Sequence, residues 1–560
     1  MRLPALARAA AIALACAALP PGAEAQGSPA TPVERTLRGA VKCTVDLPQE
    51  LEATAVEKDT WQRLCRGEFV QLNRGDPERG LLCNPAKIEG KVPENRRLRP
   101  QFLSLILTHP RYTTALARTQ VRISCALIAG ELDLENEHIT PELGLFDSHL
   151  SQGANLLRTR FDRSLFLQAS TVEGTLVAAG LRVGGDLFLS GTTFDTVSLE
   201  GAQIRGDVEA TRTFKGFFDA SRLRVGGNLS LREGIARDGV ELNSAQIGGH
   251  LDATWSGFIG LFNADSLRVD GSLFLRDGSS FEDVNLNGAQ IGGMLQLQDS
   301  TFSGQIDLTG SMIGAELMLS LGWMRAPKWK DGAALVLRNV RVDALQAEMG
   351  AWFLDGAERT PLPTDLTGFT YGRLGGLLAD DAAAANDGGS VNMADATAAQ
   401  LIAWIEAQPD HDARYDPQPY EQLAAALDAA GAEAVARRIR YAKFEHKRKA
   451  GNIGTGETLL LWGSRLTIGH GLYPFRLLAW FAALIAAGML VAWRSRVAEL
   501  PGFWPKLWYS LENALPLIEL KPAFQAIRHP PWAESLFHAQ KVVGFVLATI
   551  LVGALTLLGG

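Results

Sequence analysis

Apolar and polar residues alternate in a nine-residue pattern that recurs along the middle of the chain. One copy, Leu181–Leu189, reads LRVGGDLFL, and the next two begin at Ala202 and Leu223 and read AQIRGDVEA and LRVGGNLSL. Apolar side chains occupy every second position of each copy, which is the period of a β-strand and not of a helix. The pattern therefore predicts short strands with one apolar face.

The copies are evenly spaced. Three more begin at Ala245, Leu267 and Ala289, and a degenerate one runs from Ser311. The residues at the fifth position of successive copies lie 21 or 22 residues apart; they are Gly185, Gly206, Gly227, Gly249, Gly271, Gly293 and Ala315. A fixed period of this size predicts a solenoid, in which each coil buries its apolar face only against its neighbours. A weaker half-unit such as Phe281–Ala289 lies between copies, so a coil has two halves.

The pattern resembles that of pentapeptide-repeat and related right-handed β-helices, whose recurring unit is a small residue, a polar residue, Leu, a polar residue and Gly. The resemblance implies a right-handed coil for the mainly β solenoid that the repeat predicts over residues 121–345. Within it, one continuous apolar file is expected inside the stack, made of Leu187, Leu229, Leu251, Leu273 and Leu295. The glycines of the repeat are expected to take the positive φ of a tight corner.

Residues 1–25 read as a secretory signal peptide. Arg2 and Arg8 form a positive region, Ala9–Leu19 is apolar, and an A-x-A site ends at Ala25. Lipidation at Cys16 is an alternative, although the large apolar residue expected three positions earlier is missing. An uncleaved N-terminal anchor would also export the domain that follows.

Four cysteines remain after this segment, at Cys43, Cys65, Cys83 and Cys125. In an exported chain they predict two disulfides, with three connectivities open. No CxxC motif is present, so neither a zinc knuckle nor a redox site is indicated. Residues 26–120 are expected to form a helical cap on the first coil, with helices over 49–73 and 98–119.

The repeat is lost after the solenoid. Residues 346–395 are rich in Gly, Ala and Asp, which predicts a linker. Residues 396–450 predict an α-hairpin similar to a tetratricopeptide unit. The favoured role of this hairpin is structural, because a single unit cannot form a binding groove, and peptide binding is the alternative. Its second helix ends in a basic run, 437–449, which indicates either contact with anionic lipid headgroups or a solvated helix face.

Residues 451–560 predict a membrane hairpin with spans at about 475–493 and 542–558. Arg494, Arg496 and Lys541 adjoin the span ends, so the positive-inside bias places the connecting loop in the cytoplasm. The signal peptide independently places the solenoid outside. The expected location is the bacterial inner membrane with the solenoid in the periplasm, and this C-terminal third resembles the tails of bacterial pentapeptide-repeat membrane proteins.

The loop between the spans contains an amphipathic segment. Its apolar residues, Trp504, Leu507, Trp508, Leu511 and Leu515, mark one face of a helix. The helix could lie at the membrane surface or re-enter the bilayer as a pore helix. The potassium-channel motif TVGYG is absent after it, which disfavours a channel.

The rest of the chain offers little sign of catalysis. No phosphate-binding glycine loop, GxSxG elbow or HExxH motif occurs, so no cofactor and no metal site are predicted. A net charge of −7 and export both argue against nucleic acid as a partner.

One set of polar residues is a candidate catalytic site. Stacking the coils would align Asp186, Asp207 and His250 in an outward column, with Asp252 in the next. Adjacent carboxylates raise each other's pKa and could serve acid–base cleavage of a polysaccharide. The favoured interpretation is a solvated polar ladder, because the column decays along the stack.

Taken together, these patterns predict a membrane-anchored envelope β-solenoid that acts as a scaffold or binding surface and not as an enzyme. Its expected partners are the membrane and an envelope protein or polysaccharide. The alternatives are a carbohydrate-active enzyme on the solenoid face and a small channel or gating module in the membrane hairpin.

Overall fold

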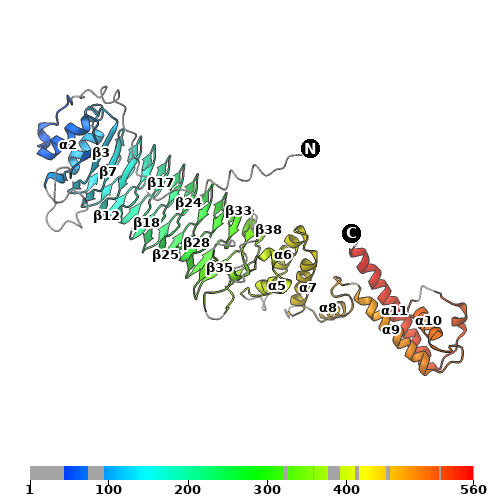
Figure 1. Ribbon diagram of the computed structural model, residues 1–560. Helices are drawn as coiled ribbons and strands as arrows, with labels where there is room; N and C mark the ends of the chain where they lie inside the picture. The colour runs from blue at the N-terminus through cyan, green and yellow to red at the C-terminus, as the bar shows by residue number, and fades with distance from the viewer. Residues whose placement is uncertain are drawn as a thin grey trace, which may run out of the picture.

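A computed structural model describes residues 43–73, 83, 94–212, 215–320, 325–356, 359–375, 391–409, 415–449, 454–473, 475–515 and 519–558. The predicted signal peptide and Cys16 lie outside these residues. Figure 1 shows a long stack of parallel coils with helices at both of its ends, followed by a separate helical unit at the C-terminus. The predicted β-solenoid is therefore confirmed as the main body of the protein.

A full coil contributes four short strand segments, and each segment pairs in parallel with its equivalents in neighbouring coils. The coil that begins at Arg224 has all four as separate strands of two residues, β19 (Arg224–Val225), β20 (Leu229–Ser230), β21 (Ile235–Ala236) and β22 (Val240–Glu241). In other coils the last two segments merge into one longer strand. Each coil is thus four-sided, with a corner after every strand segment.

The strands fall into four stacks, one on each side. The first stack is β6 (His138–Ile139), β10 (Arg160–Phe161), β13 (Arg182–Val183), β16 (Gln203–Ile204), β19, β23 (Gln246–Ile247), β26 (Arg268–Val269), β29 (Gln290–Ile291), β33 (Met312–Met318), β36 (Arg341–Gln346) and β38 (Thr370–Leu374). The second is β3 (Gln120–Ser124), β7 (Glu142–Phe146), β11 (Leu165–Gln168), β14 (Leu187–Phe188), β17 (Val208–Glu209), β20, β24 (Leu251–Asp252), β27 (Leu273–Phe274) and β30 (Leu295–Gln296), and it continues into β33, β36 and β38.

The remaining two stacks form the opposite sides. The third is β2 (Arg97–Leu98), β4 (Leu127–Ile128), β8 (His149–Leu150), β12 (Thr171–Val177), β15 (Thr193–Ser198), β21, β25 (Gly257–Asn263), β28 (Ser280–Asn285), β31 (Thr301–Phe302) and β34 (Lys328–Trp329). The fourth is β5 (Leu132–Asp133), β9 (Ala154–Asn155), β18 (Phe217–Asp219), β22, β32 (Gln305–Asp307), β35 (Ala334–Val336) and β37 (Thr364–Asp365), joined by parts of β12, β15, β25 and β28.

The core is a set of apolar files that run along the axis. Leu187, Val208 and Leu229 are register partners, and the file continues through Leu251 to Leu295. Each of these side chains is at most 1% exposed. The predicted leucine file is confirmed, with a valine completing it.

The glycines of the repeat have a different role from the predicted one. Gly185 and Gly227 do not have positive φ; the corner residues that do include Gly180, Gly201 and Arg222. A Cβ at Gly185 would instead lie 2.3 Å from Ser164 Oγ of the preceding coil. The prediction of positive φ was wrong, because these glycines are required where adjacent coils approach too closely for a side chain.

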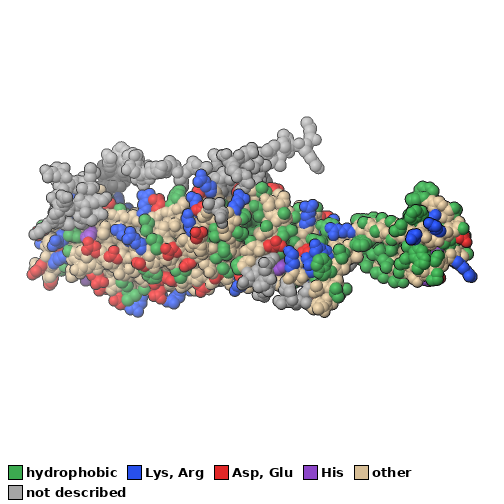
Figure 2. Space-filling view, turned by 90° about the horizontal axis from the view of Figure 1, so that it is seen from below, with side chains coloured by type: hydrophobic (Ala, Val, Ile, Leu, Met, Phe, Trp, Pro, Cys, Tyr) green, Lys and Arg blue, Asp and Glu red, His purple; other side chains and the backbone are tan. Residues whose placement is uncertain are grey.

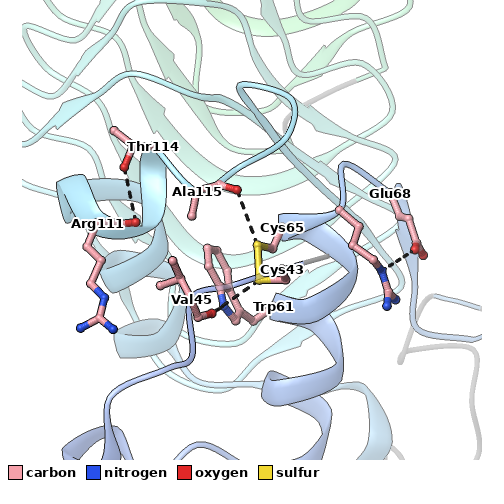
Figure 3. The surroundings of a disulfide bond; sticks show 9 residues. Cys43, Val45, Trp61, Cys65, Glu68, Arg111, Thr114 and Ala115 are labelled. Carbon is pink, nitrogen blue, oxygen red and sulfur yellow. Dashed lines mark hydrogen bonds and ion pairs between the residues drawn. A yellow bond between two sulfur atoms is a disulfide. The ribbon is translucent and has the colours of Figure 1, made fainter. Parts of the chain in front are cut away.

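The N-terminal segment closes the first coil and carries both disulfides, Cys43–Cys65 and Cys83–Cys125. Figure 3 shows the first of them between the start of the described chain and α2 (Ala55–Cys65), where the Trp61 ring lies beside it. The Trp61 indole donates a hydrogen bond to the carbonyl of Val45. The predicted pair of disulfides is present, and one of the three open connectivities is now assigned.

The cap differs from its prediction in length and content. The helices are α2, α3 (Pro100–Thr108) and α4 (Pro110–Thr113), with short 3₁₀ turns η1 (Gln49–Leu51) and η3 (Glu94–Arg96). The predicted helices over 49–73 and 98–119 were too long, because a Thr54–Glu57 capping box starts α2 and Pro110 interrupts the second. The cap also adds β1 (Val70–Gln71) to β3 and β2 to β4, so it covers the open edge of the solenoid by pairing with it.

The solenoid extends beyond residue 345. The strands β37 and β38 form a further coil, and η4 (Met349–Trp352) lies between β36 and β37. The linker predicted over 346–395 was therefore wrong for residues 346–375, because a coil can be closed by residues such as Leu366 and Tyr371 without the glycine repeat. Residues 376–390 of that linker lie outside the described part.

Three helices follow the last coil: α5 (Ala398–Glu406), α6 (Gln418–Ala429) and α7 (Glu433–Lys449), preceded by the 3₁₀ turn η6 (Met393–Asp395). The helices α6 and α7 form the predicted hairpin. Gln418 Nε2 and Gln422 Nε2 donate to the carbonyls of Phe369 and Tyr371 in the last coil. The hairpin thus docks on the end of the solenoid, which it covers.

The C-terminal unit contains α8 (Thr455–Ile468), α9 (Arg476–Arg494), α10 (Phe503–Ala514), the 3₁₀ turn η7 (Pro522–Ala526) and α11 (Pro531–Leu558). Both α9 and α11 are long and apolar enough to cross a membrane. The first predicted span agrees with α9 within one residue. The second helix begins at Pro531 and not near 542, because nothing after that proline breaks a helix, so Lys541 lies inside α11.

A charge placed in the leucine file tests the register of the whole stack. Leu251→Asp would bury a carboxylate without a partner, and we expect it to lower the free energy of unfolding by several kcal/mol or to prevent folding. The control is Ser244→Asp, at an exposed corner of the same coil. Thermal denaturation followed by circular dichroism measures both, and equal melting temperatures would contradict the register.

Candidate functional site

The carboxylate column considered as a catalytic site is a hydrogen-bonded ladder that joins the coils. Asp186 Oδ1 accepts the backbone N–H of Asp207 at 3.0 Å, and Asp207 Oδ1 accepts that of Asn228 at 2.6 Å. Asn228 Oδ1 accepts the N–H of His250, and His250 Nδ1 accepts that of Ser272 at 2.9 Å. Each side chain therefore binds the backbone of the next coil.

This geometry explains why the residue type changes along the column. Ser164, Asp186, Asp207, Asn228 and His250 share no charge or size, but each has an acceptor atom at the position that the next backbone N–H needs. The ladder is therefore more than the solvated polar column that we expected, because its members hold the coils together.

The neighbouring column contains Asp252 and Glu209. Asp252 Oδ1 accepts the N–H of Thr254 at 3.0 Å, and its other oxygen lies 3.5 Å from Arg232. Burial raises the pKa of Glu209; a hydrogen bond from Ser190 opposes the rise, and the charges of Asp207 and Asp186 add to it. The four candidate residues Asp186, Asp207, His250 and Asp252 thus all have structural partners.

A different column of polar side chains, on the first stack of strands, forms the most distinctive surface. Arg182, Gln203 and Arg224 are register partners in successive coils, with Arg160 before them and Gln246 and Arg268 after. All point outward because the alternate residues of the same strands, such as Val183, are buried. From Arg182 to Gln290 arginine and glutamine therefore alternate along one edge of the solenoid, whereas Arg160 and Arg182 are adjacent arginines.

A shallow trough of about 640 Å³ runs beside this column across the same coils. The floor of the trough is the position two residues after each Arg or Gln of the column. Three coils have glycine there, at Gly184, Gly226 and Gly248, and one coil has Arg205. A Cβ at Gly184 would lie 2.3 Å from the carbonyl oxygen of Asp162. The close stacking of the coils thus excludes side chains there, and their absence makes the trough.

The arginines of the trough differ from several others on the solenoid. Arg158, Arg212 and Arg338 each form an ion pair with a carboxylate, at 3.3, 2.5 and 2.6 Å, and Arg222 pairs with Glu200. In the described part of the chain Arg182, Arg205, Arg224 and Arg268 have no such partner. Asp162 and Asp270 lie at the two ends of the trough, and Asp162 pairs with Arg160 and His138.

Our sequence analysis did not single out these arginines. The signal was present in the second position of each repeat copy, which reads Arg, Gln, Arg, Gln, Arg and Gln from Arg182 to Gln290. This position was missed because the apolar positions predict the core and the acidic column suggests catalysis, whereas the second position of the repeat suggests neither. That the arginines lack partners follows only from the three-dimensional positions of the carboxylates.

The C-terminal unit exposes an unusual amount of apolar surface. Figure 2 shows hydrophobic side chains covering most of it, in contrast to the mixed charges of the solenoid. In α8, Leu459 and Leu460 are more than 70% exposed, and in α9 Leu490 and Trp493 are more than 60% exposed. A water-soluble unit would bury such side chains, so this surface fits a lipid environment.

The third helix of this unit packs through its polar side. Ser510 Oγ donates to the carbonyl of Ile485 in α9, and Gln540 Nε2 of α11 donates to the carbonyl of Ser510. The aromatic residues of the predicted apolar face point outward, with Trp504 64% and Trp508 41% exposed, whereas Leu515 of that face packs against Leu477, Phe481 and Leu547. The polar groups of α10 therefore lie between α9 and α11, while its aromatic side chains face away from them.

The basic run at the end of α7 is largely neutralised. Arg440 pairs with Asp428, Lys443 with Glu421, Lys447 with Glu457 and Arg448 with Glu445. The described residues contain no group of three or more His, Cys, Asp or Glu side chains that could hold a metal ion. The trough is therefore the strongest candidate for a binding site on the solenoid.

Two substitutions of Asp207 separate a structural role from a catalytic one. Asp207→Asn keeps an acceptor for the Asn228 N–H and should leave stability unchanged, whereas Asp207→Ala should cost about 1 kcal/mol, because that N–H loses its protein partner. Asp265→Ala, which removes an exposed carboxylate, is the control. Urea denaturation compares the three, and equal stabilities for Asn and Ala at position 207 would contradict the ladder.

Comparison of the chain with protein-family models, curated proteins and solved structures found no match. The parallel coil stack by itself does not distinguish pentapeptide-repeat proteins from other β-solenoids, so that resemblance stays a prediction.

Proposed function

We propose that this protein is a membrane-anchored binding scaffold without enzymatic activity, whose solenoid lies outside the bacterial inner membrane and holds an anionic ligand in the trough. The ligand would lie across several coils, against the arginines of the first strand stack. The membrane helices would keep this surface at a fixed place in the cell envelope. The unpaired arginines are the observation that carries the proposal.

Unpaired arginines are clustered along the trough of a chain with a net charge of −7. Several arginines elsewhere on the solenoid face carboxylates, namely Arg158, Arg212, Arg222 and Arg338, whereas those outside the trough without such a partner among the described residues, such as Arg163 and Arg237, are not part of this cluster. Arg182, Arg205 and Arg224 lie together without such partners beside a hollow. Arginine binds carboxylates and phosphates through two parallel hydrogen bonds, which makes these residues suited to an anion.

The anchor is proposed to include a helix at the membrane surface in addition to the two spans. The helix α8 directly precedes α9 and exposes Leu459, Leu460 and Trp462, which suits a helix lying in the interface of the membrane. Its Trp462 ring lies under the guanidinium groups of Arg448 and Arg465, at 4.4 and 5.2 Å. Both guanidinium groups also pair with Glu445, so this cluster would lie beside the lipid headgroups with part of its charge balanced while the aromatic ring enters the interface.

The helix α10 is proposed to lie within the bilayer beside α9 and α11. Its outward Trp504 and Trp508 would contact lipid, and its Ser510 and Asn513 would be shielded by the two spanning helices. A Cβ at Gly488 would lie 2.2 Å from Ser510 Oγ, so α9 provides a glycine where α10 comes close. This packing, with small and polar groups between helices, is typical of membrane proteins.

Replacing three arginines of the trough should weaken the binding of anions. The probe is fluorescent dextran sulfate, and the test variant is Arg182→Gln/Arg205→Gln/Arg224→Gln. We expect its affinity to fall at least about tenfold relative to the unsubstituted chain, because charge-assisted hydrogen bonds are lost.

The matched control is Arg158→Gln/Arg222→Gln/Arg338→Gln, which removes the same charge from ion-paired positions. Fluorescence anisotropy on the detergent-solubilised full chain gives the dissociation constants. Equal losses in the two triple variants would mean that dextran sulfate responds to net charge, and the proposed site would be wrong.

Topology can be tested with fusions to a reporter that is active only in the cytoplasm. A fusion after Arg528, between the two spans, should be active, and a fusion after Gly454, before α8, should be silent. The signal segment and the basic residues Arg494 and Arg496 support this orientation. The opposite pair of results would place the solenoid in the cytoplasm and remove the envelope from the proposal.

A further inference from the structure

The arginines of the trough are separated by a regular interval. On the first strand stack, Arg182, Arg224 and Arg268 alternate with Gln203 and Gln246 in consecutive coils. Paired strands lie about 4.8 Å apart, so successive arginines of this column are about 10 Å apart along the axis. The trough extends from the coil of Arg160 to the coil of Arg268. These coils are separated by five intervals of about 4.8 Å, so the trough is about 24 Å long.

The alternation has an electrostatic reason within the protein. Guanidinium groups in adjacent coils would repel one another at about 5 Å, well inside the Debye length of about 8 Å at physiological ionic strength. A glutamine between them doubles the distance and keeps a hydrogen-bond donor and an acceptor in every intervening coil. From Arg182 onward the column therefore offers charge at every second coil and neutral hydrogen bonding at the others. Arg160, in the coil before Arg182, is the exception, and its charge is paired with Asp162.

We infer that the ligand is a linear polysaccharide that carries one acidic group on every second sugar. This inference rests on the proposed function of the trough as an anion site. The chain would lie along the solenoid axis, its carboxylates or sulfates on Arg182, Arg224 and Arg268. The neutral sugars between them would place hydroxyl groups against Gln203 and Gln246.

The spacing and the chemistry favour this ligand over other polyanions. An extended pyranose chain advances by close to one coil spacing per sugar, so a disaccharide repeat matches two coils. Duplex nucleic acid carries one charge per about 1.7 Å of its axis, much denser than the arginines can neutralise. An acidic peptide in extended form presents one face every second residue, at about 6.7 Å, which fits neither one coil nor two.

Arg205 modifies the pattern in one coil. It belongs to the same coil as Gln203 but lies two residues later, at the position that is glycine in the neighbouring coils (Gly184 and Gly226). Its charge is therefore displaced sideways from the arginine column, across the floor of the trough. An acidic group on the other edge of the polysaccharide would reach it, so Arg205 is expected to strengthen binding without changing the spacing that the column selects.

The test compares polymers that differ in charge spacing. The probes are hyaluronan fragments, with one carboxylate per disaccharide, and polygalacturonate fragments of equal length, with one per sugar. Neutral dextran and oligothymidylate are added as references. We expect the detergent-solubilised full chain to bind hyaluronan at least about tenfold more tightly than polygalacturonate per fragment, measured by titration calorimetry at constant ionic strength.

Two variants make the comparison specific. Gln246→Arg places three arginines in adjacent coils, and we expect it to strengthen binding of polygalacturonate relative to hyaluronan. Arg224→Gln removes the central charge, and we expect it to weaken hyaluronan binding about tenfold. Both positions are exposed, and unchanged melting temperatures would show that each variant keeps its fold.

The outcomes distinguish this inference from the function on which it rests. Affinity that rises with charge density, so that polygalacturonate or oligothymidylate binds most tightly, would overturn the spacing rule while keeping an anion site. Binding of dextran alone, or of no polymer, would overturn the anion site as well. An unchanged preference in Gln246→Arg would also overturn the spacing rule.

Discussion

The close approach of adjacent coils is the constraint on which the rest of the solenoid depends. Where the coils meet most tightly, a Cβ at Gly185 or Gly206 would collide with a side-chain oxygen of the coil before. Those same oxygens accept backbone N–H groups, so one short distance both excludes side chains and supplies hydrogen bonds. Parallel β-pairing on all four sides then aligns equivalent residues in straight columns. Core files, the acceptor ladder and the arginine column all follow from that alignment.

Alignment also determines how charge can be distributed. A residue type repeated at one position of every coil becomes a column with about 4.8 Å between its members, which is favourable for leucine and unfavourable for arginine. The chain meets this constraint in two ways. It pairs arginines with acids in adjacent coils, as at Arg212 and Glu233, or it interposes glutamine, as at Gln246. The second arrangement leaves charge available to a ligand.

The sequence predicted the solenoid well because its evidence is local and repeated. The leucines of the core recur every 21 or 22 residues, and alternation within each copy identifies which side chains face inward. The last coil was missed because its core residues, among them Leu366 and Tyr371, follow no repeated pattern. The length of α2 was overestimated because periodicity continues past Cys65, where the helix ends.

The candidate site could be predicted only in part. The column of Asp186, Asp207 and His250 was aligned correctly, but its function depends on hydrogen bonds between coils that sequence does not contain. The arginine column was visible as an alternation, although the absence of its acidic partners was not.

The alternation also changes what counts as the unit of this fold. Leu and Ala alternate at the inward position before each Arg or Gln, as at Leu181 and Ala202, and Val and Ile alternate after it. A larger inward residue before the Arg or Gln is thus followed by a smaller one after it, and the order is reversed in the next coil. Two successive coils therefore form one complementary block. Gene rearrangements that add or delete such a block of two coils would preserve both core packing and surface pattern. The length of the proposed recognition surface can therefore evolve in whole blocks, while the capped ends and the C-terminal helices stay the same.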